Sequence, residues 1–428
     1  MDAPSRVLII TYYWPPTAGS GVQRWLKFAK YLPAYGWEPV VFTPENPDFD
    51  LKDESLVKEV PAQMEVLKFP IWEPYHLLRK AKRQEIKDTS VILEQKRKSL
   101  LDHVAIWLRA NTLIPDPRVF WVRPSVKYLV DILAANNFKA VITTGPPHSM
   151  HLIGRNLKRA TGIPWIADFR DPWSSWEFLD TLPMMSLVRQ RHRKLEGSVF
   201  GEANALITIS PTFQQEMEEL SGRSVHLLTN GFDADDLPVD FAKEPSKGRV
   251  FEIVYAGVID AIRNPIPFLN ALRKSFGSTE LSVRMTFVGR VSEAVKTFIA
   301  EDSWLIRHVA FAGYVSHEEV FRYYERAHLL LLILTDTKNA KGNIPGKLFE
   351  YLATNRRILA LGDPAGDAAK LIHDAEAGKV ISHSEEGEIE AFLHVANTLR
   401  ATPLPSAGMG SFERRRITGK LAEILDEL

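Results

Sequence analysis

The sequence predicts an α/β protein made of two doubly wound domains, each with a parallel sheet covered by helices on both faces. Short runs rich in Val, Ile, Leu and Phe alternate along the chain with longer segments of helical periodicity. Near-continuous apolar strands joined by helical crossovers are typical of parallel sheets that are buried on both faces. The series of strands begins anew near residue 250, which indicates two such domains in succession.

Size and composition agree with this organisation. The chain has 428 residues, of which 45% are hydrophobic and 25% charged. At roughly 150 residues per domain, this length has room for two or three domains. Lys and Arg total 53, as do Asp and Glu, so no charge excess favours nucleic acid as a partner. The lack of Cys excludes disulfides, thiolate metal sites and a cysteine nucleophile.

We expect a cytoplasmic protein. Residues 1–5 do not join a basic region to an apolar stretch, as a signal peptide does. The longest apolar run, 329–334, is far shorter than the roughly 20 residues that a membrane span requires.

Thirteen strands are expected along the chain. The predicted ranges are 6–11, 39–43, 65–69, 140–144, 164–169, 205–210 and 225–228 in the first domain, and 251–256, 284–288, 308–312, 329–334, 357–361 and 379–382 in the second. A polar segment with two prolines, 235–249, is the expected linker, and a second Pro/Gly-rich break at 401–410 precedes an amphipathic stretch. The predicted organisation is therefore a first domain over 1–235 with an insertion at about 73–123, a second domain over 250–400, and a terminal helix over 411–428.

A glycine-bearing loop follows the first strand. Gly19, Ser20 and Gly21 precede a helix, so backbone N–H groups point into the crevice at the strand ends, which suits a phosphate or a sugar oxygen. Arg24 occupies the third glycine position of a dinucleotide fingerprint, so a nicotinamide cofactor is poorly supported. The alternative is a glycine turn that only reverses the chain.

His148 follows the strand at 140–144 and opens the next helix. A histidine at a helix N-terminus favours the neutral imidazole, which can exchange a hydrogen bond with a sugar hydroxyl. The alternative is a capping or packing role, and His151, a turn further along, fits that alternative better.

Three polar residues, Asp168, Arg170 and Asp171, end the strand at 164–169. One of the carboxylates there could bind an acceptor hydroxyl or act as its base. The alternative is an Arg–Asp pair that fixes a turn. Sequence alone leaves open which aspartate faces a ligand.

The second domain carries a candidate anion site. Gly257 ends a strand, Arg263 follows in the loop, and Gly346 and Lys347 begin a later helix, where a diphosphate could bind. Glu350 lies one turn further on and can accept two ribose hydroxyls. The alternative is a solvated Lys–Glu pair on a helix surface.

Taken in order, these motifs resemble the GT-B glycosyltransferases of the glycosyltransferase family 4 type. The resemblance covers nearly the whole chain. It rests on the Pro-Pro and Gly19-Ser20-Gly21 loop and on four further segments, Thr144-Gly-Pro-Pro-His148, Gly162-Ile-Pro-Trp-Ile-Ala-Asp-Phe-Arg-Asp-Pro-Trp173, Asn230-Gly-Phe-Asp233 and Pro345-Gly-Lys-Leu-Phe-Glu-Tyr-Leu-Ala353. It implies two Rossmann-like domains with an active site in the cleft between them, and a final helix that crosses back to the first domain.

The resemblance also implies transfer of a glycosyl group from a nucleotide sugar with retention, without a metal and without a cofactor. By position, Glu350 matches the ribose-binding glutamate, and Arg263 and Lys347 are the candidates for the basic pair on the diphosphate. Gly19 and Gly21 match the loop that faces the transferred group, and His148 a residue near the transferred sugar. We expect the diphosphate between the first of these loops and the basic pair.

Two positions depart from the family pattern. Gly342 stands where the family often has a first glutamate, and Val258 replaces an arginine that often follows the glycine. The donor sugar therefore stays open. The alternatives are a nucleotide-sugar 2-epimerase of the same fold and a non-catalytic partner subunit, with an NAD-dependent enzyme the weakest.

The expected acceptor is a glycan or a lipid-linked molecule in cell-surface polysaccharide or glycolipid assembly. Residues 76–109 hold nine basic and four acidic residues, and a second basic cluster, Arg189, Arg191, Arg193 and Lys194, adjoins apolar residues. Basic segments interleaved with apolar residues suit adsorption to anionic lipid at the inner membrane face. The alternative is two solvated helices.

Overall fold

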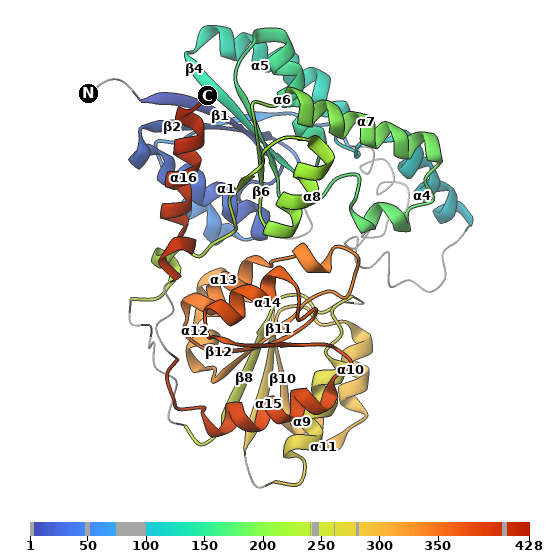
Figure 1. The fold of residues 1–428 in the computed structure, drawn as a ribbon, viewed down its shortest axis with the longest axis vertical. Helices are drawn as coiled ribbons and strands as arrows, with labels where there is room; N and C mark the ends of the chain where they lie inside the picture. The colour runs from blue at the N-terminus through green and yellow to red at the C-terminus, as the bar shows by residue number, and fades with distance from the viewer. Residues whose placement is uncertain are drawn as a thin grey trace. The chain divides into compact units, whose positions relative to one another are not determined.

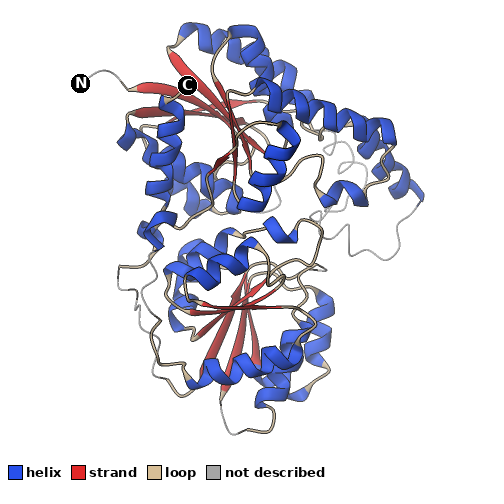
Figure 2. Cartoon of the chain, viewed as in Figure 1, coloured by secondary structure: helices blue, strands red, loops and turns tan. Residues whose placement is uncertain are grey.

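The computed structural model describes residues 4–47, 52–73, 100–239, 241, 248–260, 262–279, 282–404 and 409–428. The chain divides into two compact units (Figure 1). Unit 1 comprises residues 1–229 and the C-terminal Arg414–Leu428, and unit 2 comprises Asn230–Glu413. Each unit has one parallel sheet with helices on both faces (Figure 2). The predicted α/β class is thereby confirmed.

The sheet of unit 1 has the strand order β3-β2-β1-β4-β5-β6-β7. The strands are β1 (Ser5–Ile10), β2 (Trp37–Pro44), β3 (Glu65–Phe69), β4 (Phe138–Gly145), β5 (Trp165–Phe169), β6 (Ala205–Thr208) and β7 (His226–Leu227). All neighbouring strands pair in parallel. The order runs outward in both directions from β1 and β4, so the switch point of this sheet lies between those two strands.

Helices cover both faces of this sheet. They are α1 (Ser20–Tyr31), α4 (Leu100–Thr112), α5 (Val119–Ala135), α6 (Ser149–Thr161), α7 (Ser186–Glu202), α8 (Pro211–Ser221) and α16 (Arg414–Asp426), with 3-10 turns η1 (Leu32–Tyr35), η2 (Glu54–Glu59) and η3 (Glu177–Thr181). Apolar residues of α1 and α16 pack on one face of the sheet, and those of α5, α6 and α7 on the other. Strand residues alternate between the two cores, as a sheet buried on both sides requires.

The C-terminal helix belongs to unit 1. Ile417, Leu421 and Leu425 recur on one face of α16 and enter the same core as α1. The Trp37 indole N–H donates to Asp426 over 2.9 Å, and the Tyr35 hydroxyl donates to the Arg415 carbonyl over 2.8 Å. Hydrophobic burial together with these two bonds fixes the last helix against α1 and the start of β2.

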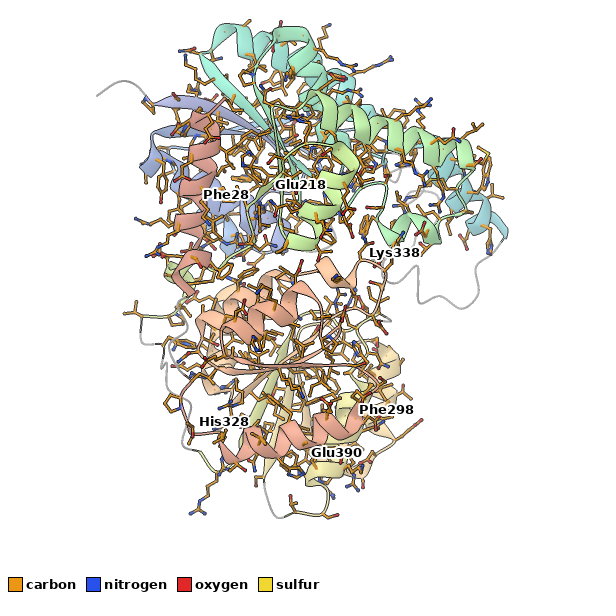
Figure 3. All side chains as sticks on the ribbon, in the orientation of Figure 1. Phe28, Glu218, Phe298, His328, Lys338 and Glu390 are labelled. Atoms are coloured by element: carbon orange, nitrogen blue, oxygen red, sulfur yellow. The ribbon has the colours of Figure 1, made fainter. Side chains whose placement is uncertain are left out.

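The sheet of unit 2 has the order β10-β9-β8-β11-β12-β13, again parallel throughout. Its strands are β8 (Phe251–Ala256), β9 (Val283–Val288), β10 (Val309–Gly313), β11 (Leu329–Ile333), β12 (Arg357–Leu361) and β13 (Gly378–Ile381). The switch point lies between β8 and β11. His328, which is labelled in Figure 3, lies just before β11. Its Nδ1 accepts a hydrogen bond from the Glu252 N–H of β8 over 3.0 Å, which ties the starts of these two strands together.

Helices again cover both faces of the second sheet. They are α9 (Ile266–Phe276), α10 (Glu293–Ala300), α11 (Ser303–His308), α12 (His317–Arg326), α13 (Gly346–Ala353), α14 (Asp367–Asp374) and α15 (Glu386–Thr398), with 3-10 turns η4 (Ala234–Asp236), η5 (Ala340–Gly342) and η6 (Met409–Phe412). One core contains α9, α10, α11 and α15, and the other contains α12, α13 and α14.

Parts of two predicted segments lie outside the described residues. In the expected insertion, 74–99 are not described, and 100–123 form α4 and the start of α5. In the expected linker, 240 and 242–247 are not described.

Candidate functional site

The predicted motifs of unit 1 follow the two strands that flank its switch point. The Gly19–Gly21 loop follows β1, and His148 follows β4. Gly19 has φ +122°, a left-handed conformation that favours glycine, and is the N-cap of α1 without a side-chain cap. A Cβ added to Gly21 would lie 1.9 Å from Nη1 of Arg170. The structure therefore brings Gly21 and Arg170 together, and a larger residue at position 21 would require the Arg170 guanidinium to move.

Asp168 is fully buried and is held by three side chains. Arg24 donates to both of its carboxylate oxygens, over 3.0 and 3.3 Å, and the Trp25 indole N–H donates over 2.9 Å. The Thr144 hydroxyl donates over 3.0 Å. Arg24 also donates to the Thr229 carbonyl. Asp168 therefore ties β5 to α1 and positions the Gly19–Gly21 loop, which gives it the geometry of a positioning residue; its predicted catalytic role stays a prediction.

The same ion pair explains the departure at Arg24. The sequence shows that Arg24 replaces the third glycine of a fingerprint, and the structure shows what the arginine does there. Its side chain is 1% exposed and forms a buried ion pair with Asp168 at 3.0 Å. Breaking a buried pair of this kind leaves a charge without a partner and costs about 3–5 kcal/mol.

Asp171 differs from Asp168 in both exposure and bonding. Its carboxylate is partly exposed and forms no hydrogen bond with any residue in the ranges described above. Burial raises the pKa of this carboxyl, while Arg170 opposes the rise and Asp168 adds to it. Of the two aspartates, Asp171 is thus the one available to a ligand. Arg170 lies between them, with Nε donating to Thr144 over 3.0 Å and Nη2 donating to the Pro146 carbonyl.

His148 is the N-cap residue of α6, and its side chain is largely enclosed. The residue is 6% exposed, and its ring stacks on Trp173 at 4.8 Å between centroids and an interplanar angle of 3°. Burial, followed by the positive fields of His151 and Arg170, holds the pKa of His148 well below its usual range. The ring is therefore neutral at physiological pH, and burial is the main cause instead of the helix terminus. Neither ring nitrogen has a hydrogen-bond partner of acceptable geometry in the described structure.

His151 has a structural role. The Trp165 indole N–H donates to the Thr143 hydroxyl over 2.8 Å, and that hydroxyl shares a second hydrogen bond of 2.9 Å with Nδ1 of His151. The ring packs on Phe169 at 4.3 Å, and burial lowers its pKa to about 3. A Cβ added to Gly145 would lie 2.5 Å from Nε2, so glycine is required beside it.

Sequence reasoning missed a polar network beyond the end of β1. The Tyr12 hydroxyl contacts both carboxylate oxygens of Glu73, at 3.0 and 2.9 Å, and Arg118 pairs with Glu73 at 2.9 Å. Glu73 is completely buried. Asp116 accepts from the first N–H of α6, at Ser149, over 2.8 Å. Glu73, Asp116 and Arg118 fall in the expected insertion, and the Tyr12-Tyr13 pair directly after the first strand was the available signal.

In unit 2, Gly257 and Lys347 come together at the switch point. Nζ of Lys347 donates to the Ala256 carbonyl over 2.8 Å and lies 3.9 Å from the centroid of the Tyr255 ring. Gly257 has φ +129°, and a Cβ added there would lie 3.0 Å from Nζ. Burial, with a smaller contribution from Arg263, lowers the pKa of Lys347 to about 7. Lys347 bonds to the backbone of β8 and not to Glu350, so the alternative of a solvated Lys–Glu pair does not describe it.

The remaining predicted residues of unit 2 surround this lysine. Gly346 begins α13, whose N-cap residue supplies no side-chain bond. The Leu348 N–H donates to the Pro345 carbonyl, which leaves the N–H groups of Gly346 and Lys347 for a ligand. The Tyr324 hydroxyl donates to Glu350 over 3.3 Å. The side chain of Arg263, 33% exposed, pairs with Asp260 at 2.7 Å.

Two further glycines line the same edge of the second sheet. Gly289 and Gly313 end β9 and β10 with φ +124° and +72°. A Cβ on Gly289 would lie 2.2 Å from the Gly257 carbonyl oxygen, and the Gly289 N–H donates to Gly313 over 2.7 Å. Three adjacent strands thus end in bare backbone that a ligand can approach. The sequence signal, a glycine directly after each strand, was overlooked.

Over the described ranges, no group of three or more His, Cys, Asp or Glu is arranged to hold a metal ion. Within the same ranges, no helix is both long enough and apolar enough to cross a membrane.

The fold and the paired switch-point sites define the class of the protein. The structure aligns with sucrose-phosphate synthase from Thermosynechococcus elongatus at a TM-score of 0.65 and 13% identity, over 99% of this chain and 98% of that one. It aligns with Anabaena HepE, solved in complex with UDP and glucose, at a TM-score of 0.62 and 15% identity, over 99% and 100%. A putative UDP-N-acetylglucosamine 2-epimerase from Listeria monocytogenes aligns at 0.57 and 12%, over 100% and 98%. The chain therefore has the GT-B fold.

The family follows from the sequence of unit 1. Residues 19–231 match the family model of the glycosyl transferase 4-like domain. No curated protein matches the chain by sequence. The chain is thus a GT-B protein that belongs, through this domain, to the glycosyl transferase 4-like family, and the resemblance drawn from its motifs is confirmed.

Proposed function

We propose that the protein is a glycosyltransferase that moves a sugar from a nucleotide sugar to a glycan or lipid-linked acceptor. The observation that carries this proposal is the Lys347 site, where an enclosed ammonium lies against Gly257 at the start of α13. A cation, open helical N–H groups and a glycine backbone form a site for a diphosphate. The solved structure of HepE with UDP and glucose agrees with a nucleotide-sugar donor for this fold.

In the proposed reaction, unit 2 stabilises the leaving nucleoside diphosphate. Lys347, Arg263 and the first N–H groups of α13 supply the positive charge that other enzymes draw from a metal ion, so the reaction runs without a metal or cofactor. Glu350 accepts the ribose hydroxyls. Transfer with retention of configuration is the chemistry that the family resemblance implies. That the Gly19–Gly21 loop also faces the donor stays a prediction.

In unit 1, the proposed acceptor residues are Asp171 and His148. The acceptor hydroxyl must lose a proton as the new glycosidic bond forms, and the Asp171 carboxylate can accept it. Burial raises the pKa of Asp171, which makes its carboxylate a stronger base than that of an ordinary aspartate. The neutral His148 ring can exchange hydrogen bonds with a sugar hydroxyl. Asp168 and Arg170 both bond to Thr144 and so fix the ends of β4 and β5, which the residues of this site follow.

We also propose that the acceptor side of unit 1 contacts a membrane. Exposed apolar side chains gather on α4, at Val104, Trp107 and Leu108, and at the start of α7, where Leu187 is 73% exposed. Asn111 joins the two segments, because it donates to the Pro183 carbonyl over 2.9 Å and accepts from the Met185 N–H over 2.8 Å.

Basic residues extend this apolar patch along α7. Leu187, Arg191 and Lys194 recur at helical spacing on its exposed face. Each basic residue near an anionic surface contributes about 1 kcal/mol. Most of the first basic segment lies outside the described residues. Sedimentation with anionic vesicles at low salt should carry the protein down, and the double variant Trp107→Ser, Leu187→Ser should stay in the supernatant. Wild-type protein that stays in the supernatant would favour a soluble acceptor.

A thermal-shift screen against UDP, GDP, ADP, CMP and TDP sugars tests the donor half of the proposal. A ligand that binds only the folded protein raises its apparent stability. We expect one nucleotide class to raise the melting temperature of wild type and to lose that effect in Lys347→Ala. An unchanged melting temperature with every nucleotide sugar would contradict the proposed function and favour a non-catalytic partner subunit.

The 2-epimerase is the second candidate function, since a putative epimerase shares the fold. Labelled nucleotide sugar incubated without acceptor separates the two, because an epimerase converts it and a transferase requires an acceptor. Gly342 leaves no second carboxylate in the Gly342–Glu350 loop, which favours the transferase.

A further inference from the structure

Two buried polar residues on the inner face of α7 bond to the segment that follows Asp171. His192 and Glu196 lie one helical turn apart, and both are more than nine-tenths buried. The Trp173 indole N–H donates to Nδ1 of His192 over 3.1 Å. Since an indole N–H can only donate, Nδ1 of His192 carries no proton. Burial lowers the pKa of His192 to about 4, with Arg189 adding to the effect, so this acceptor persists at physiological pH.

Glu196 binds the next residue of the same segment. Its carboxylate accepts from the Ser174 N–H over 3.1 Å and from the Ser174 hydroxyl. Burial raises the pKa of Glu196, and the bonds from Ser174 oppose that rise. A buried carboxylate is costly unless it is well bonded, so a residue of this kind is expected where it fixes something that a hydrophobic side chain could not.

The held segment connects directly to both proposed acceptor residues. Trp173 is 1% exposed and stacks flat on His148, so its orientation sets the orientation of that ring. Asp171 lies two residues before Trp173, and Pro172 between them restricts the backbone. Fixing Trp173 and Ser174 on α7 therefore limits where the Asp171 carboxylate can point.

We propose that His192 and Glu196 are positioning residues that hold Asp171 and His148 in the geometry for acceptor binding and proton transfer. This inference rests on the proposed function of those two residues. Neither His192 nor Glu196 contacts the reacting atoms. Both act through the Trp173–Ser174 segment, and the donor site of unit 2 does not depend on them.

The first test is hydrogen–deuterium exchange of peptides that cover 170–175. His192→Phe leaves the Trp173 N–H without an acceptor, and Glu196→Ala removes both bonds to Ser174, so both should exchange faster there. His192→Asn places an amide oxygen near the position of Nδ1 and should restore slow exchange. Val199→Ala is the matched control, because Val199 is buried on the same helix outside this network. It should lower the melting temperature without loosening 170–175.

The second test measures labelled-sugar transfer from the nucleotide sugar found by thermal shift to a total lipid extract. We expect kcat to fall about 10-fold to 100-fold in His192→Phe and Glu196→Ala, as for a misplaced catalytic group. The rate should recover in His192→Asn, and calorimetric affinity for the nucleotide sugar should stay unchanged. Unchanged exchange over 170–175 in both variants would overturn the inference. Wild type without transfer activity would instead refute the proposed function, while the exchange result still decides whether α7 holds the segment.

Discussion

At its switch point, unit 1 is built from buried charges, whereas unit 2 is built from bare backbone and one lysine. In unit 1 the Arg24–Asp168 pair lies directly beneath the loops, with a second buried pair, Arg118–Glu73, near the end of β1. In unit 2, a glycine ends or directly follows three adjacent strands, and Lys347 donates its hydrogen bond to a backbone carbonyl, with Glu350 and Asp260 near enough for their charges to raise its pKa.

This difference between the two units indicates which charged side chains remain available to bind a ligand. A buried ion pair whose hydrogen bonds are all formed within the protein has no donor or acceptor left for a ligand, and it fixes the backbone around it. Burial lowers the pKa of Lys347 to about 7 despite the nearby charges of Glu350 and Asp260, so an incoming anion can stabilise the protonated form. The buried charges at the switch point of unit 1 therefore fix the positions of Asp171 and His148. At the switch point of unit 2, the Lys347 ammonium remains available for a diphosphate.

Removing one member of the buried pair in unit 1 should have the largest effect on folding. Arg24→Ala leaves the Asp168 carboxylate buried and unpaired, so the free energy of unfolding should fall by about 3–5 kcal/mol. Arg263→Ala in unit 2 is the matched control, because the Arg263–Asp260 pair is partly exposed and should change stability by no more than about 1 kcal/mol. Urea unfolding of both variants measures the two losses of unfolding free energy. Equal losses would contradict the difference drawn between the switch points of unit 1 and unit 2.

Asp171→Asn should nearly abolish transfer while the protein stays folded. Loss of a general base typically lowers kcat by about 100-fold to 10,000-fold. The Asp171 carboxylate has no hydrogen bond to a described residue, so the melting temperature should hold. Labelled-sugar transfer and a thermal melt are the measurements. Full activity in Asp171→Asn would show that Asp171 is not the general base and that another residue of unit 1 accepts the proton.

Lys347→Ala should weaken nucleotide-sugar binding by about 10-fold to 150-fold, the value of one charge-assisted contact of about 1.5–3 kcal/mol. Lys274→Ala is the control in the same unit, since Lys274 is exposed and pairs with Glu390 on α15. Calorimetry distinguishes them. Equal affinities in the two variants would show that the diphosphate binds away from α13.

The smallest expected effect is a pH dependence of donor affinity. The pKa of Lys347 is about 7 in the free protein, and a bound diphosphate favours its protonated form. Affinity should therefore be highest below that pKa and fall about 10-fold between about pH 6 and about pH 8. A nucleotide sugar is the suitable probe, because its diphosphate does not titrate in this range. Lys347→Met should bind weakly at every pH, and a wild-type affinity that is flat with pH would contradict the assignment.

The fold could be predicted because its signals are local and repeated. Apolar strands separated by amphipathic helices occur throughout the chain. This pattern is typical of parallel sheets that are buried on both faces. The places of the candidate loops could also be predicted, since glycine and polar residues directly after parallel strands reach the same edge of a sheet. Their roles in binding stay a prediction.

The division of labour within those loops could not be predicted. Asp168 and Asp171 are near neighbours in one motif, and only the three-dimensional position of Arg24, far away in sequence, separates a buried anchor from an available carboxylate. His148 and His151 differ in the same way, because the partner of His151 is Thr143 on the neighbouring strand. The burial of Glu196 could not be predicted from sequence, because a glutamate on a helix rich in basic residues is expected to face solvent.

Labelled-sugar transfer, measured with and without an acceptor extract, tests directly whether the protein is a glycosyltransferase. Each nucleotide sugar that stabilises the protein is incubated with wild type, Asp171→Asn and Lys347→Ala. We expect acceptor-dependent incorporation by wild type, loss of incorporation with intact donor binding in Asp171→Asn, and loss of both in Lys347→Ala. Conversion of the donor without an acceptor, or full incorporation by Asp171→Asn, would contradict it.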